Sequence, residues 1–399
     1  MRMPAILYSC AGLLLAALLW HGSASGQHQH AGHGAAAMGK SAELGALAAV
    51  DSRGILWAAH KDGGHVVVSR SNDLGRNWSK PVRVTLEAEG TDTGGDARPK
   101  VATGGAGELY VTWTRPLSKP YTGEIRFSRS LDGGQTFSAP LTVHADRQEI
   151  THRFDSIGVN RSGQIFVAWI DKRDGVAAGK AKLPYRGAAV YFAVSDDRGA
   201  SFRGDYKLAD HVCECCRIAL AARADGSLLA LWRHVFAPNI RDHALAAMYP
   251  DGRVGAVQRA TFDDWRVDAC PHHGPSLAQD GKDRLHAVWF TQAPGRAGVF
   301  YGRLRADGVD SQRRVGGDTA EHADLALIGE RIAVAWKEFD GERSQLRAMV
   351  SEDGGDNWRE HRLAATGGAS DQPHLLVWNG RFYVFWNTRN EPLSVSPVP

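Results

Sequence analysis

The chain has 399 residues, with 47 Lys and Arg against 44 Asp and Glu, so its formal net charge is only +3. A charge this close to balance argues against a nucleic-acid-binding protein and against electrostatic attachment to an anionic membrane. The length is sufficient for one large domain built from repeats.

The first 26 residues predict a secretory signal peptide. Arg2 supplies the positive charge, residues 5–20 form an apolar run too short for a permanent membrane span, and residues 24–26 fit a cleavage site between small residues. We therefore expect an exported protein, periplasmic or secreted, whose mature chain begins at Gln27 and has no membrane span.

Residues 27–43 predict a flexible leader, because three histidines within 28–33 are followed by Ala-rich sequence. A His-rich tract binds Cu(II), Ni(II) or Zn(II) loosely, although incidental histidines in disordered sequence give the same pattern. We expect residues 44–399 to form a single domain.

A repeat organises this domain. A β-rich segment ending in Trp recurs every 50 to 60 residues or so, and residues 55–59 are an earlier copy that ends in Ala. The repeated tryptophans are Trp113, Trp169, Trp232, Trp289, Trp336 and Trp386. We expect them to pack between sheets rather than to bind a ligand.

Each copy has a strand-like segment before it and further strand-like segments after it, which predicts four antiparallel strands per unit. Such a unit is one blade of a β-propeller. We therefore predict an all-β fold, a β-propeller with seven blades, with six blades as the alternative if one unit is divided. The seventh unit has no clear fourth strand, and an N-terminal strand is one way to complete it, since a closed ring hides its sheet edges.

Four turns share the pattern Ser-x-Asp-x-Gly-x-(Thr/Ser/Asn)-(Trp/Phe), at 71–78, 130–137, 195–202 and 351–358. The Asp accepts backbone hydrogen bonds, the Gly permits a positive φ, and the aromatic residue forms an apolar plug. The pattern resembles the Asp-box, or BNR, repeat of sialidase-like β-propellers, over most of residues 45 to 395. The fourth and fifth units have weaker turns at 249–252 and 305–308.

This resemblance implies a propeller, and it implies sialidase activity only if the family's active-site residues are present. In that family an arginine triad binds the substrate carboxylate, with an Asp general acid and a Tyr–Glu nucleophile pair. The usual (Phe/Tyr)-Arg-Ile-Pro segment is absent, and the nearest segment is 96–99. The candidate catalytic residues for such a glycosidase are Arg98, Asp155, Asp171, Arg233 and Arg389.

The segments that lead into the innermost strands should meet on one face of the ring, with the Asp boxes on the opposite face. Cys213, Cys215 and Cys216 precede the fourth blade and Cys270 precedes the fifth, so neighbouring blades bring the four thiols together. The predicted metal ligands are Cys213, Cys215, Cys216, Cys270, His272, His273, His322 and His374. Thiolate and imidazole favour copper as the first expectation and zinc as the alternative, for metal handling or redox chemistry.

Two other interpretations stay open at the level of sequence. The four cysteines can form two disulfides, because an exported protein folds in an oxidising compartment. The propeller can also be a platform for a protein partner or a small anionic ligand, without chemistry of its own. Whether the chain is an enzyme is therefore undecided by the sequence.

Overall fold

The computed structural model describes residues 44–389 and 391–399, which belong to one compact unit, Ser41–Pro399. The predicted signal peptide (1–26) and leader (27–43) lie outside the described residues. In the part of the chain that is described, no helix is both long and apolar enough to pass through a membrane.

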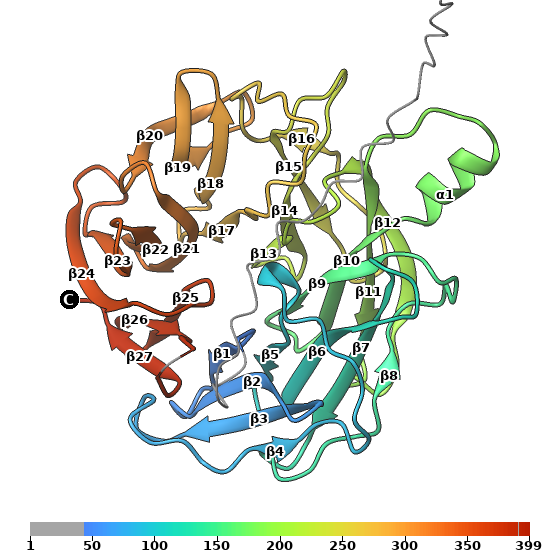
Figure 1. The fold of residues 1–399 in the computed structure, drawn as a ribbon, viewed down its shortest axis with the longest axis horizontal. Helices are drawn as coiled ribbons and strands as arrows, with labels where there is room; N and C mark the ends of the chain where they lie inside the picture. The colour runs from blue at the N-terminus through green and yellow to red at the C-terminus, as the bar shows by residue number, and fades with distance from the viewer. Residues whose placement is uncertain (1–43, 390) are drawn as a thin grey trace, which may run out of the picture. The chain divides into compact units, whose positions relative to one another are not determined.

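Seven antiparallel sheets surround a common centre (Figure 1), and the strands of each sheet follow one another in chain order. The innermost strands are β1 (Leu47–Val50), β5 (Lys100–Thr103), β9 (His152–Val159), β13 (Ala219–Ala222), β17 (Ser276–Gln279), β21 (Ala320–Ile328) and β25 (His374–Trp378). The second strands are β2 (Leu56–Asp62), β6 (Leu109–Pro116), β10 (Ile165–Asp171), β14 (Leu228–Arg233), β18 (Leu285–Ala293), β22 (Arg331–Phe339) and β26 (Arg381–Trp386).

The third strands are β3 (His65–Ser71), β7 (Gly123–Ser130), β11 (Ala188–Ser195), β15 (His243–Met248), β19 (Arg296–Leu304), β23 (Ser344–Ser351) and β27 (Ser394–Pro397). The outermost strands are β4 (Val82–Arg83), β8 (Leu141–Thr142), β12 (Arg203–Val212), β16 (Gln258–Arg259), β20 (Val309–Val315) and β24 (Arg359–Thr366). A short turn η1 (Gly95–Ala97) precedes β5, and α1 (Arg173–Lys180) joins β10 to β11. The predicted all-β propeller with seven blades is confirmed.

The hydrophobic core is divided among the seams between blades. Each of its seven clusters joins side chains of two neighbouring blades, the seam between the last and the first included. The second strands are apolar on both sides because each blade is covered by two neighbours, and β10 and β14 are buried along their whole length. The six repeated tryptophans are at most 2% exposed, as expected for packing residues.

Among the described residues, no strand from the N-terminal end joins the seventh blade to close the ring. The seventh blade has three strands, all from the C-terminal part, and its innermost strand β25 contacts β1. The Asp371 carboxylate of this blade accepts hydrogen bonds from the backbone N–H groups of Gly45 and Ala46, at 2.8 and 2.9 Å. Trp78 of the first blade donates through Nε1 to the Leu393 carbonyl at 2.9 Å. Polar contacts therefore connect the two ends of the ring.

The ring has two distinct faces. We call the face at which the innermost strands begin the top face and the opposite one the bottom face. The four Asp-box turns connect third and fourth strands, so they lie on the bottom face; in the first blade, Leu56 pairs with both Val50 and Ser71. In each box the Ser Oγ donates to the Asp carboxylate at 2.7–2.8 Å and accepts the Gly N–H at 2.8–2.9 Å.

Candidate functional site

Three buried thiols form a triangle on the top face, where the chain enters the fourth blade. The Sγ atoms of Cys213 and Cys215 are 3.7 Å apart, those of Cys215 and Cys216 are 3.9 Å apart, and those of Cys216 and Cys213 are 3.7 Å apart. The three residues are 1%, 5% and 2% exposed. We call these three residues the thiol triangle.

The backbone around the triangle is held at both ends. The Cys213 N–H donates to the Arg233 carbonyl at 2.9 Å, which continues the pairing of the blade beyond β13. The chain then turns through residues 214–216, and the Arg217 N–H donates to the Asp96 carboxylate at 3.1 Å. This short turn between the anchored residues Cys213 and Arg217 brings the three sulfurs together.

Cys270, which enters the fifth blade, lies beside the triangle. Its thiol interacts with those of Cys213 and Cys215, and the contact with Cys213 is the main reason that the pKa of Cys270 rises to about 11. Unlike the three triangle residues, Cys270 is exposed. All four are unpaired thiols in the structure, since a disulfide needs sulfurs about 2.05 Å apart.

The three thiols of the triangle differ in acidity. Hydrogen bonds from Cys215 and Cys216 hold the pKa of Cys213 well below its usual range, and the nearby Arg233 guanidinium lowers it further. Contact with Cys213 raises the pKa of both Cys215 and Cys216. Thiolate, which is the metal-binding form of cysteine, is therefore favoured first at Cys213.

Arg233 is a buried cation beside these sulfurs. It is 1% exposed, and it donates to the carbonyls of Arg241, His273 and Phe290 at 2.8, 3.1 and 2.8 Å. Among the described residues, no carboxylate forms an ion pair with it, and its Nε has no hydrogen-bond partner. A buried charge without a counterion is costly, so a negative group near Arg233 stabilises it.

Two of the predicted histidine ligands, His273 and His322, form a second group apart from the thiol triangle. One donor atom each from His273, Glu321 and His322 lies within 4.8 Å of the others. The two imidazole rings are stacked, with centroids 4.5 Å apart and planes 24° apart. Lone pairs of stacked rings lie in separate planes, so a single ion reaches both only after one ring rotates.

The charges around this histidine group also disfavour a cation. Burial, then the positive charge of Arg233, lowers the pKa of His273 to about 4. Burial lowers the pKa of His322 as well. Lys337 lies 3.2 Å from the Glu321 carboxylate and already neutralises it. The group therefore consists of neutral imidazoles beside a satisfied ion pair.

The remaining two predicted histidine ligands have separate environments. His374 Nδ1 is 2.8 Å from an oxygen of Asp324. The same carboxylate accepts from Ser276 Oγ at 2.7 Å and from the Leu375 N–H at 2.9 Å, so it joins the fifth, sixth and seventh blades. His272 is exposed, two residues after Cys270, in a backbone conformation with φ of 56°.

A cavity of about 290 Å³ lies at the centre of the ring, lined by residues of all seven innermost strands or the segments before them. Arg98, Lys100 and Arg217 supply its cations. Arg98 Nη1 donates to the Gln372 carbonyl at 2.8 Å, and Lys100 Nζ donates to the carbonyls of Asp96 and Arg98. The Arg98 bond connects the second and seventh blades, which are not neighbours, whereas the Lys100 bonds stay within one segment.

Arg217 is the most fully engaged of these cations. Its Nε donates to the Pro275 carbonyl at 2.8 Å, its Nη1 to Gln372 Oε1 at 3.2 Å and its Nη2 to the Ala323 carbonyl at 2.7 Å. An arginine with these bonds stabilises the centre of the ring. It has little capacity left to bind the carboxylate of a substrate.

The five candidate catalytic residues are not brought together. Asp155 lies 3.5 Å from Lys100, and Lys100 in turn donates to the Arg98 carbonyl. Asp171 instead accepts from Trp169 Nε1 and pairs with Arg173 at 2.7 Å. Arg233 lies beside the thiols, and the Arg389 N–H donates to the Ala369 carbonyl in the seventh blade.

One residue of the thiol region was not singled out by the sequence. His243 pairs directly with Arg233 in the fourth blade, so Cys213, Arg233 and His243 form a cross-strand row with side chains on one face of the sheet. His243 is 1% exposed and its Nε2 has no hydrogen-bond partner. The sign of it in the sequence was that His243 is a polar residue in the otherwise apolar strand β15.

No family model and no curated protein matches the chain. Solved structures do match. The polysaccharide lyase Uly1 is 10% identical, with 91% of this chain and 90% of that chain covered and a TM-score of 0.55. An α-L-arabinofuranosidase of Fusarium graminearum is 13% identical, with 73% and 87% covered and a TM-score of 0.50. A Hadza microbial sialidase is 16% identical, with 74% and 63% covered and a TM-score of 0.46. The likeness to the lyase and the arabinofuranosidase supports the β-propeller fold and nothing finer.

Proposed function

We propose that this chain is an exported soft-metal-binding propeller that holds Cu(I) at Cys213, Cys215 and Cys216. The observation that carries the proposal is the spacing of the three sulfurs. Sulfurs bound to one ion at about 2.3 Å lie about 3.8 Å apart for tetrahedral angles and about 4.0 Å apart for trigonal angles. The thiol triangle has separations of 3.7, 3.9 and 3.7 Å.

The surrounding charge supports the same assignment. Three thiolates around a monovalent ion have a net charge of −2, and burying that charge requires a nearby cation. Arg233 is such a cation, already buried and without a carboxylate partner among the described residues. Its three carbonyl bonds fix the guanidinium in place.

The donor set favours copper over zinc. All three buried donors are thiolates, which Cu(I) accepts readily, whereas structural Zn(II) sites are nearly always four-coordinate. Cys270 is the available fourth sulfur, and it is exposed at the edge of the site. An exposed sulfur beside three buried ones suits an ion that is received and released, so we assign the site to metal handling.

The test is a Cu(I) titration of the mature chain, purified without oxygen, against a chromophoric Cu(I) chelator. We expect one ion per chain, and no tight binding once Cys213, Cys215 and Cys216 are all changed to Ser. The matched control changes His273 and His322 to Asn and keeps the copper. Equal binding by the triple variant contradicts the proposal, as does a thiol titration showing that the isolated wild type holds two disulfides.

A second candidate is an anionic saccharide in the axial cavity, favoured by the cations Arg98 and Lys100 that line it. Glycosidases and polysaccharide lyases use the same fold at low sequence identity. Hydrolysis of a fluorogenic sialoside that falls with Arg98→Ala supports this candidate. Absence of turnover by the wild type contradicts its sialidase form.

A further inference from the structure

The connection between β10 and β11 is the longest of those that join a second strand to a third, and it carries α1, the only α-helix among the described residues. It comprises residues 172–187 on the top face, and α1 lies at the edge of the ring (Figure 1). The next longest connection of this kind, 234–242, is much shorter. We call residues 172–187 the β10–β11 loop.

Both ends of the β10–β11 loop are held against the chain that carries the buried sulfurs. At its start, Lys172 Nζ lies 2.5 Å from the carboxylate of Glu214, which is inside the turn of the thiol triangle. At its end, a Cβ added to Gly187 would lie 2.0 Å from the carbonyl oxygen of Val212, directly before that turn. A molecule that docks on the loop is therefore placed beside the thiol site.

The second part of the loop carries positive charge without a counterion. Residues 176–187 contain Lys180, Lys182 and Arg186 and no carboxylate. Within the described part of the chain, none of these three cations forms an ion pair. Lys180 and Lys182 are exposed, and Leu183 beside them is 63% exposed. We call residues 176–187 the basic segment.

The carboxylates near the base of the loop are already paired. Glu214 pairs with Lys172, and Asp174 and Asp210 lie 3.0 and 3.1 Å from Lys207 Nζ. These carboxylates therefore do not neutralise the basic segment. Cations of this kind attract a negatively charged surface and speed its approach.

Cys270 is the point at which an ion reaches the thiol site from outside. The three residues of the thiol triangle are at most 5% exposed, whereas Cys270 is exposed and its thiol interacts with that of Cys213. The basic segment belongs to the third blade and Cys270 leads into the fifth, so a ligand that contacts both covers the surface of several blades. A surface of that extent suits a protein partner better than a small chelate.

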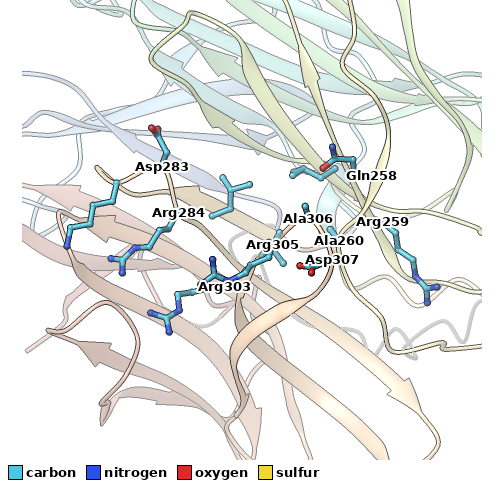
Figure 2. A pocket seen from close by; sticks show the side chains of 13 residues that line it. Gln258, Arg259, Ala260, Asp283, Arg284, Arg303, Arg305, Ala306 and Asp307 are labelled. Atoms are coloured by element: carbon cyan, nitrogen blue, oxygen red, sulfur yellow. The ribbon is translucent and has the colours of Figure 1, made fainter.

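The larger cavity of the molecule provides no second route for a soft metal ion. It has a volume of about 550 Å³ and lies between the fourth and fifth blades, beside the bottom-face turns at 282–284 and 305–307 (Figure 2). None of the described residues that line it is a cysteine, histidine or methionine. Its cations pair with carboxylates, for example Arg284 with Asp280 at 2.6 Å. We therefore expect an ion carried on sulfur to arrive at the top face.

We propose that the basic segment is the docking surface for a Cu(I)-carrying protein with an acidic surface, which passes its ion to the thiol site through Cys270. This inference rests on the copper site proposed above. In the transfer, a bond from Cu(I) to a thiolate of the partner breaks as a bond to Cys270 Sγ forms. The copper keeps its oxidation state, and the proton of the Cys270 thiol passes to the freed thiolate of the partner.

The experiment uses two synthetic peptides as Cu(I) donors. Both hold the ion through the same Cys-Gly-Gly-Cys segment, and they differ only in having Glu or Gln at the flanking positions. Transfer to the full mature chain is followed by stopped-flow absorbance at several salt concentrations. We expect the acidic donor to transfer its ion about tenfold faster at low ionic strength, and this advantage to disappear at high salt because the charges are screened.

Lys180→Gln combined with Lys182→Gln should remove the preference for the acidic donor. The Kd of the thiol triangle for Cu(I) should not change in this variant, since neither lysine touches the ion. The matched control combines Arg76→Gln with Lys80→Gln, which removes two exposed cations of the bottom face that form no ion pair within the described residues. This control should keep the full preference.

Three results overturn the proposal. The two donors transfer their ion to the wild type at the same rate, the double lysine variant keeps the preference, or the bottom-face control loses it to the same extent. In each of these cases the Cu(I) titration of the wild type still shows one tightly bound ion per chain. A wild type that binds no Cu(I) in that titration contradicts the proposed function and this inference together.

Discussion

The two faces of the ring differ in how regular their connecting segments are. On the bottom face, four Asp boxes repeat the same hydrogen bonds to within about a tenth of an ångström. On the top face, the segments leading into the blades differ from one another, and three of them place Phe154, His272 and His322 at positive φ. Repetition marks the residues that build the scaffold, whereas the irregular segments bring unusual side chains together.

From this comparison we expect substitutions on the top face to change ligand affinity and substitutions on the bottom face to change stability. Cys215→Ser removes one of three buried donors, so we expect the Cu(I) affinity to fall about 100-fold or more. Cys270→Ser should lower the Cu(I) affinity by about tenfold only, because this sulfur lies at the edge of the site. Ser130→Ala in the Asp box of the second blade should leave the Kd unchanged. Copper titrations of the three variants measure the difference, and a loss of affinity in Ser130→Ala breaks the comparison.

Arg233 connects metal binding to stability on the top face. Arg233→Met leaves three buried carbonyls without their donor, so the free energy of unfolding should fall by about 3 kcal/mol. The same change removes the cation beside the thiolates and should weaken Cu(I) binding. Arg233→Lys keeps the charge and should recover part of the affinity. Denaturant unfolding and copper titration give the two values, and a Met variant that binds copper as tightly as the wild type rules out the charge argument.

Groups on the two faces should also lose their contributions to the stability of the fold in different pH ranges. On the top face, burial and then the neighbouring His152 lower the pKa of His144 from its ordinary 6.5 to about 4. The unfolded chain therefore binds this proton first, and stability is lost as the pH falls from about 6.5 to about 4, by up to about 3 kcal/mol for this buried group. His144→Asn should flatten this part of the profile.

On the bottom face, the Thr136 hydroxyl and N–H lower the pKa of Asp132 from 3.8 to about 2. A depressed carboxyl pKa stabilises the fold above about 3.8, and this contribution disappears as the pH falls through about 2. Unfolding measured against pH should show both steps. Asp132→Asn should reduce only the lower step, because Asp73, Asp197 and Asp353 have the same depressed pKa of about 2. A single merged step would contradict the assignment to separate faces.

The smallest expected effect compares two turns of the bottom face. Asp132 accepts bonds from Ser130 Oγ, the Gln135 N–H, and the Thr136 N–H and hydroxyl. Asp251, in the plain turn of the fourth blade, accepts only from Arg253 among the described residues. Asp132→Ala should lower the Tm by a few degrees and Asp251→Ala by less, with copper binding unchanged. Equal shifts in a thermal melt would remove the distinction between boxed and plain turns.

Much of the fold was predictable because it depends on local and periodic signals. The spacing of the tryptophans indicated seven blades, and the Ser-Asp-Gly pattern indicated the bottom-face turns. Closure of the ring was not predictable in this way. The contact of Asp371 with Gly45 depends on the two ends of the domain meeting after every blade has formed.

The candidate site was predictable only in part. The sequence placed Cys213 and Cys270 at neighbouring blade entrances, and in the structure Cys270 lies close enough to Cys213 to shift its pKa. It also suggested that His273 and His322 belong to the same group as the sulfurs, whereas the structure stacks these two rings on each other. The direction of a side chain near the start of an innermost strand depends on local φ, such as 54° at His322 in β21, and this φ follows no repeat.

The sequence alone determined the repeat, the strand pattern and the chemical nature of the side chains on each face, because these depend on short-range spacing and on side-chain type. Only the tertiary structure decided which polar groups share a site. It placed Arg233 and His243 beside the sulfurs and brought His273 and His322 together in a separate group. Such distances are set by how seven separate sheets pack around one axis, and no segment contains that information by itself.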